Sequence, residues 1–144
     1  MKVVVQRVKN ASVKVEDQIV GEIDKGLLLL VGFTEGDNLE KINYMVNKVI
    51  NLRVFDDNNG VMNLSVQDVK GSILSVSQFT LYGDASKGNR PSYINALKGD
   101  EAVKLYKEFN NRLNSVIHTE EGVFGADMEV NLLNDGPITI IIEK

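Results

Sequence analysis

Hydroxyl and amide side chains gather at one end of the apolar stretch ILSVSQFTLYG, residues 73–83. Regular alternation along a strand places Ser77 and Phe79 on one face, and Gln78 and Thr80 then share the other. Buried polar groups are unfavourable unless they are hydrogen-bonded, so two interpretations stay open. Either the strand leaves the core here and meets water, or these side chains and nearby backbone N–H groups line a small pocket. Such a pocket can hold an ester and stabilise an oxyanion without a histidine or a metal.

A second candidate is NDGPITI, residues 134–140, which contains one of only two prolines in the chain. Asn-Asp-Gly is a turn signal, Gly136 tolerates backbone angles closed to other residues, and Pro137 has no N–H for a sheet ladder. The plain interpretation is a hairpin connection between closing strands at 126–133 and 138–142. The functional one is a rigid corner whose carbonyl oxygens face a ligand. The pattern alone does not predict a cis peptide bond, because only about 5–6% of X–Pro bonds are cis.

The remaining ionisable residues predict little chemistry. His118 is the only histidine and is expected at the end of the second helix, where a cation is favourable. Zinc-type sites need several His or Cys, and the chain has no cysteine. Asp56 and Asp57 are typical of a hairpin turn, and residues 120–121 of a solvated loop. We therefore predict no metal site and no cofactor, and no side-chain base is apparent.

Composition limits the class of protein. The 144 residues are 43% hydrophobic and 25% charged, which is typical of one soluble domain covering residues 1–144. The absence of cysteine and the short, interrupted apolar start MKVVVQRVKNASV favour a cytoplasmic protein with no membrane association. The net charge of −4 argues against a protein that follows a long phosphate backbone. The same charge is compatible with a protein that binds only one end of a nucleic acid.

Strands and helices that would position these candidates follow from periodicity. Apolar positions along residues 36–52 predict a helix whose start resembles a capping box of Asp37 and Glu40, with Leu39 on its inward face. A second helix is expected to start at a capping Asp100 and to bury residues as far as Val116. Strands are predicted at 3–8, as hairpins over 11–23 and 52–66, at 24–33, at 72–83, and at the two closing segments. The helices do not alternate regularly with the strands, so a doubly wound parallel sheet is not expected. The predicted fold class is α+β, with a mainly antiparallel or mixed, β-barrel-like sheet and two main helices.

The two candidate motifs together resemble a known family. SQFTL (77–81) and NDGPIT (134–139) are similar to the two signature motifs of the D-aminoacyl-tRNA deacylases, also called D-tyrosyl-tRNA deacylases, and the resemblance extends over the whole chain. It implies an enzyme that hydrolyses the ester between a D-amino acid and the 3′-terminal adenosine of tRNA. It also implies a homodimer in which a cis Gly136–Pro137 pair enters the active site of the partner subunit.

Individual roles follow from the same resemblance. Residues implied to be catalytic are Ser77, Gln78, Phe79 and Thr80. Residues implied to bind substrate or to select its chirality are Gly136, Pro137, Arg7, Phe124 and Met128, of which Arg7 orients the Gly-Pro carbonyls and the last two lie near the terminal adenine. The substrate's ribose 2′-hydroxyl is implied to assist the reaction. If the Gly-Pro carbonyls exclude an L side chain by steric clash, glycyl-tRNA should be cleaved as well.

Three points stay open. Lys87 and Arg90, in the polar loop GDASKGNRPS, either contact tRNA phosphates or belong to a solvated loop. Thr80 can act as a nucleophile or as a positioning residue, and the missing base favours positioning. Two alternative functions are a non-catalytic RNA-binding barrel and a general small-ester hydrolase that uses Thr80.

Overall fold

One long strand, β1 (Lys2–Val15), is the centre of the sheet in the computed structural model, which describes residues 1–144. It pairs antiparallel with β8 (Glu129–Glu143) along one edge, and with β2 (Gln18–Ile23) and β3 (Gly26–Gly32) along the other. The expectation of separate strands at each end of the chain is wrong. Both β1 and β8 continue through their irregular middles, because shifts in register on either side of Val8 absorb the extra residues.

The other strands make the sheet mixed. β6 (Ser72–Ser77) runs parallel to β3, and β7 (Thr119–Glu121) runs parallel to β6, which gives the order β2-β1-β3-β6-β7. Residues 120–121 therefore belong to a strand and not to the predicted solvated loop. β4 (Phe55–Asp56) and β5 (Met62–Leu64) form a separate hairpin around Asn58-Asn59-Gly60, as predicted.

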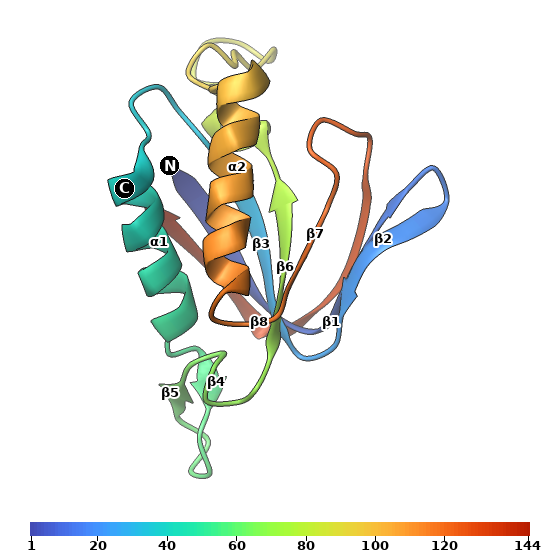
Figure 1. Cartoon of the computed structure of the whole chain (residues 1–144), viewed down its shortest axis with the longest axis vertical. Helices are drawn as coiled ribbons and strands as arrows, with labels where there is room; N and C mark the ends of the chain where they lie inside the picture. Colours follow the sequence, from blue (N-terminus) through green and yellow to red (C-terminus); the bar gives the residue numbers. More distant parts are fainter.

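Two helices, α1 (Leu39–Asn51) and α2 (Gly99–Asn114), lie side by side over one face of the sheet (Figure 1). Their apolar faces and the facing strand residues form the larger core, in which Leu27, Leu29, Ile73 and Phe109 are fully buried. A smaller core fills the curved part of the sheet, where β2 approaches β6 and β7; it consists of Val8, Ala11, Val13, Ile23, Leu28, Leu74 and Val76. The predicted α+β fold is confirmed: a nearly closed, barrel-like mixed sheet with two main helices.

Helix α1 starts one residue later than the predicted cap. Asn38 is its N-cap, and its side chain accepts the Lys41 N–H at 3.1 Å. Asp37 is buried instead, with its carboxylate 2.6 Å from the amino group of Met1 and 3.0 Å from Lys41 Nζ. The capping-box prediction is wrong because this carboxylate has cationic partners outside the helix backbone.

Helix α2, in contrast, starts earlier than predicted. Lys98 is its N-cap, and Asp100 lies in the first turn, where a carboxylate is still favourable. Leu39 and Val116, expected to face inward, are about half exposed because they lie at or beyond the helix ends. His118 lies past the end of α2, in the connection to β7, and its Nε2 is 3.1 Å from Glu120 Oε1. Neither α1 nor α2 has the length and apolar character required to cross a membrane.

Candidate active site

A pocket of about 280 Å³ opens where β3 and β6 end. Residues 31–33 and 76–79 form one side, and residues 124–128 form the other. Leu97, Ala102 and Val130 complete the lining. The pocket is therefore enclosed by two strand ends, the start of α2 and the loop between β7 and β8.

Strand β6 ends at Ser77, whereas the predicted strand continued past Thr80. The Gln78 N–H still bonds the Val31 carbonyl at 2.7 Å, but the chain then turns into a short 3-10 helix, η1 (Phe79–Tyr82). Gly32 permits this turn, because a Cβ atom at that position would lie only 3.0 Å from the Gln78 carbonyl oxygen. A hydrophobicity pattern cannot reveal such a turn, since it depends on a glycine in a different strand.

The turn leaves backbone donors available at the pocket. The first hydrogen bond of η1 runs from the Leu81 N–H to the Gln78 carbonyl at 3.3 Å. The N–H groups of Phe79 and Thr80 precede that bond and have no acceptor within the helix. Donors of this kind can stabilise negative charge that develops on an ester oxygen.

Three of the four predicted catalytic residues line the pocket, and the fourth does not. Ser77, Gln78 and Phe79 are lining residues. Thr80 is exposed beside the pocket, and its hydroxyl accepts a hydrogen bond from Gln78 Nε2 at 2.5 Å. Phe79 is 47% exposed and packs edge-on against Tyr93, with ring centroids 5.2 Å apart. The Thr80 hydroxyl therefore supports a neighbouring side chain and lies outside the cavity.

The opposite wall contains both residues expected near the adenine, Phe124 and Met128. It also contains Asp127, the one ionisable side chain in the lining, which sequence reasoning missed. Leu97 and Ala102 were missed as well. Nothing in their local pattern marks them, because they reach the pocket only through the tertiary packing of the start of α2 on the end of β3.

The Gly136–Pro137 peptide bond is cis, and both residues are exposed. Gly136 has φ of 126°, a conformation that side chains rarely adopt, so glycine is required there. Arg7, only 7% exposed, lies beneath the pair. Its Nε donates to the Asp135 carbonyl at 3.0 Å, and its Nη1 donates to the Val54 carbonyl at 2.7 Å. Arg7 thus connects the residue before the Gly-Pro pair to the buried end of the β4–β5 hairpin.

Two carboxylates balance the buried guanidinium. Asp56 and Asp135 each approach Arg7 at 3.4 Å, and both are partly exposed. Charged groups become costly to bury when they lack a partner, so the two carboxylates allow Arg7 to remain under the motif.

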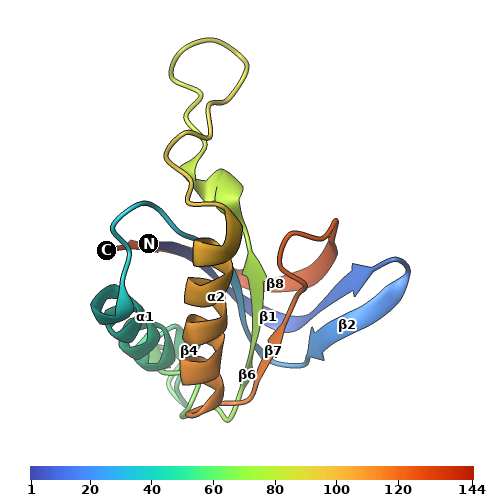
Figure 2. The ribbon, with the colours of Figure 1, turned by 45° about the horizontal axis from the view of Figure 1, so that its top comes forward.

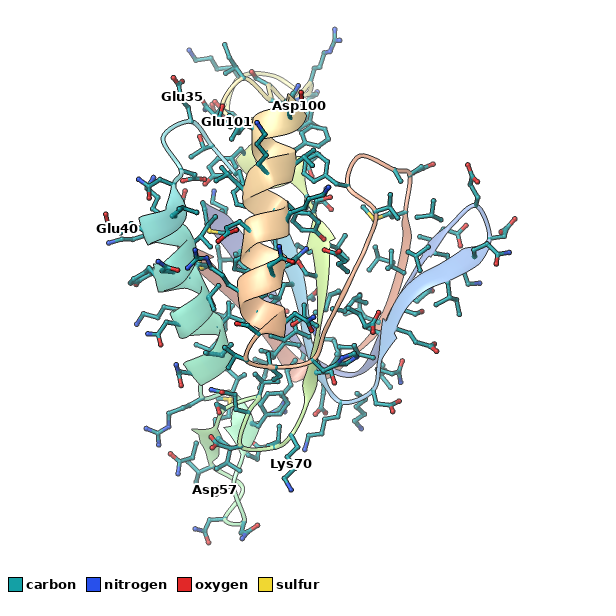
Figure 3. The ribbon with its side chains drawn as sticks, in the orientation of Figure 1. Glu35, Glu40, Asp57, Lys70, Asp100 and Glu101 are labelled. Carbon is teal, nitrogen blue, oxygen red and sulfur yellow. The ribbon has the colours of Figure 1, made fainter.

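The pocket and the Gly-Pro pair lie at opposite ends of β3. Arg7 is paired with Leu27 near the start of the strand, whereas Ser77 is paired with Val31, four residues further along. At roughly 3.3 Å per residue this separation is about 13 Å. In Figure 3, Asp57 on the β4–β5 hairpin and Glu101 at the start of α2 mark the two ends of the molecule. The pair does not contribute to the pocket of its own chain.

A projecting loop follows η1, whose first residue, Phe79, lines the pocket. Two hydrogen bonds of 2.8 Å between Asp84 and Ser92 close its base, and it extends beyond the body of the molecule (Figure 2). Lys87 and Arg90 lie on this loop and are exposed. No group of three or more His, Cys, Asp or Glu side chains is arranged to hold a metal ion.

Comparison with known proteins agrees with this geometry. A solved structure described as "c-Myc DNA Unwinding Element Binding Protein" is 40% identical in sequence, with 100% of this chain and 99% of that chain covered and a TM-score of 0.94. A second, described as "Structural Analysis of a probable eukaryotic D-amino acid tRNA deacylase", shares the fold at a TM-score of 0.82 and 17% identity, with 98% and 97% covered. The family model described as D-Tyr-tRNA(Tyr) deacylase matches residues 4–143. The chain therefore belongs to the D-Tyr-tRNA(Tyr) deacylase family and is a tRNA deacylase of the hydrolase class.

Proposed function

We propose that this deacylase binds the 3′-terminal adenosine of a D-aminoacyl-tRNA in the pocket at the end of β6 and cleaves its ester there. The observation that carries the proposal is the character of the lining. Its polar groups are the side chains of Ser77 and Gln78, the carboxylate of Asp127 and main-chain groups, set among apolar walls. A volume of about 280 Å³ accommodates a small group and cannot enclose a folded nucleic acid.

Main-chain donors then carry the chemistry. The free N–H of Phe79 or Thr80 stabilises the oxyanion that forms as water attacks the ester carbon. His118 cannot serve as the base, because it lies beyond the far end of α2 and pairs with Glu120. The ribose 2′-hydroxyl next to the ester supplies the assistance that a side-chain base would otherwise give. Thr80 acts as a positioning residue, consistent with its hydrogen bond to Gln78.

A second copy of the chain completes the site. The Gly136–Pro137 pair is exposed and lies about 13 Å along β3 from its own pocket, by strand register. In a homodimer it enters the pocket of the partner subunit. Strand β8 also presents exposed apolar side chains, among them Leu133 and Ile141, and such side chains are suited to a protein interface.

The inserted pair selects chirality. The carbonyl oxygens of Gly136 and Pro137 bind the substrate's amino group, and their bulk occupies the direction that an L side chain would take. A D side chain points away from them, and glycine has no side chain to exclude. The site therefore rejects the wrong substrate by steric clash and does not recognise a particular side chain. Glycyl-tRNA is cleaved as a consequence.

The projecting loop contacts the tRNA. Lys87 and Arg90 are exposed cations on the loop that follows η1, within a chain of net charge −4. They bind phosphates near the 3′ end, so only a few phosphates need to be neutralised. Substitution of either residue by alanine should weaken tRNA binding and reduce its dependence on salt. An unchanged salt dependence in both variants would place the loop in solvent.

We expect the enzyme to act in the cytoplasm, on aminoacyl-tRNA before it reaches translation.

A single experiment separates this function from its alternatives. The protein is incubated with D-tyrosyl-tRNA, L-tyrosyl-tRNA, glycyl-tRNA and a simple aryl ester. We expect cleavage of the first and third and little cleavage of the others. Binding of tRNA without cleavage would favour a non-catalytic RNA-binding barrel. Cleavage of the aryl ester, independent of tRNA, would favour a general esterase.

A further inference from the structure

Tyr106 lies beneath the pocket, between its two walls. It is 2% exposed and belongs to the buried face of α2, one turn after Ala102, which lines the pocket. Tyr106 itself is not a lining residue. Any effect of this side chain on the reaction must therefore pass through the residues that it contacts.

The Tyr106 hydroxyl joins the two segments that lead into the pocket. It donates to the Ser75 carbonyl at 2.8 Å, and the same carbonyl accepts the Gly122 N–H at 2.9 Å. Ser75 comes two residues before Ser77 on one wall, and Gly122 comes two residues before Phe124 on the other. One buried carbonyl thus fixes the point from which both walls extend.

The ring of Tyr106 supports the second wall directly. Its centroid lies 5.6 Å from that of Phe124, at a tilt of 52°. This separation is in the range of favourable aromatic pairs. Burial raises the pKa of the Tyr106 hydroxyl above its ordinary value of 10.0, so the group remains a protonated donor at every pH at which the enzyme would work.

We propose that Tyr106 is a positioning residue for the deacylation reaction. Its hydroxyl sets the end of β6, where the oxyanion donors begin, and its ring holds Phe124 in place against the terminal adenine. The two functions are carried by different parts of one side chain and can be separated by substitution. The role of the hydroxyl in the reaction rests on the proposed function. The role of the ring, which holds Phe124, can be measured by nucleotide binding without turnover.

The test compares Tyr106→Phe with Tyr106→Leu in the full-length protein. Tyr106→Phe keeps the ring and leaves the Ser75 carbonyl bonded to Gly122, so the fold should survive. We expect its single-turnover rate on D-tyrosyl-tRNA to fall about tenfold, equivalent to one lost hydrogen bond to a buried carbonyl. Its Kd for adenosine monophosphate, used as a probe for the terminal nucleotide, should change by less than about twofold. Tyr106→Leu should lose rate and also weaken adenosine monophosphate binding by about fivefold, because the aromatic pair is lost.

Tyr44→Phe, on the partly exposed face of α1, is the matched control and should leave both readouts unchanged. A purely structural Tyr106 would give Tyr106→Phe a lower Tm but the wild-type rate and Kd wherever both proteins are fully folded, and that result would overturn the proposal. Equal loss of rate and affinity in Tyr106→Phe would also overturn it. A wild-type protein that binds adenosine monophosphate without cleaving D-tyrosyl-tRNA would refute the proposed function. The nucleotide affinity of Tyr106→Leu would then still decide whether Tyr106 holds Phe124.

Discussion

Replacement of Arg7 by lysine tests whether the support beneath the Gly-Pro pair controls selectivity. The guanidinium bonds two carbonyls at once, that of Asp135 at 3.0 Å and that of Val54 at 2.7 Å. A lysine ammonium keeps the charge but not the planar fork, and it can reach only one of these positions well. Arg7→Lys therefore loosens Asp135, the residue immediately before the pair, without leaving the nearby carboxylates uncompensated.

The magnitude follows from the lost contact. A hydrogen bond from a charged donor to a buried acceptor contributes about 1.5–3 kcal/mol. The loss is smaller than the total stability of an ordinary domain, about 5–15 kcal/mol, so Arg7→Lys should remain folded. If the lost energy positions the pair for the substrate's amino group, kcat/KM for D-tyrosyl-tRNA falls about 10- to 150-fold. Cleavage of L-tyrosyl-tRNA should rise at the same time, because the carbonyls proposed to exclude its side chain become mobile.

The assay is deacylation of D-, L- and glycyl-tRNA under single-turnover conditions, with the free energy of unfolding measured on the same samples. Arg53→Lys is the matched control, since Arg53 is exposed and donates to the Asn63 carbonyl of β5 at 2.9 Å and not to the Asp135 carbonyl. We expect Arg53→Lys to behave as wild type. If Arg7→Lys loses the expected stability but keeps the wild-type ratio of D- to L-cleavage, Arg7 only stabilises the fold and the reasoning is wrong.

Three further predictions concern single side chains. Thr80→Ala should slow turnover only about tenfold, through the lost hydrogen bond to Gln78; complete loss with intact binding, or a trapped acyl-Thr80, would make Thr80 the nucleophile. Asp127→Asn should keep the rate within about threefold, whereas a substrate with a 2′-deoxy terminal adenosine should react far more slowly; the reverse pattern would identify Asp127 as the base. Hydrogen bonds from Ser65, mainly from its backbone N–H and secondly from its hydroxyl, hold the pKa of Asp68 below its ordinary value of 3.8. The stability that this carboxylate contributes is therefore present above pH 3.8 and is lost as the pH falls through the lowered pKa. Asp68→Asn should therefore be less stable than wild type at pH 7, and the difference, measured by urea unfolding, should close at acid pH.

The architecture was accessible from the sequence where a strong local pattern exists. The continuous apolar run of β3, the period of α1 and the Asn58-Asn59-Gly60 turn each predict the element that forms, because one local interaction dominates at each place. The errors have a common cause. Asp37 was expected to cap α1, but it pairs with the Met1 amino group, which is distant in sequence.

The site was predicted only as far as its motifs extend. Ser77, Gln78 and Phe79 do line a pocket, but the turn after Ser77 depends on Gly32 in β3. Asp127 and the contact of Tyr106 with Ser75 carry no sequence signal, because strand pairing and helix packing bring them to the site. Single-sequence patterns report local preference, and these contacts are long-range.

The most direct measurement is the rate of deacylation of matched D-tyrosyl-tRNA and L-tyrosyl-tRNA by the wild-type protein, compared with mixed dimers of the proposed assembly. One subunit of the mixed dimer carries Phe79→Ala in its pocket and the other carries Arg7→Lys beneath its Gly-Pro pair. In the proposed assembly, such a dimer keeps one intact pocket, and that pocket receives the intact Gly-Pro pair of the other subunit. We predict strong preference for the D-substrate and about half of the wild-type activity in this mixed dimer, although each variant is impaired alone. Fast cleavage of L-tyrosyl-tRNA by the wild type, or a mixed dimer no more active than the variants, would contradict the proposed shared site.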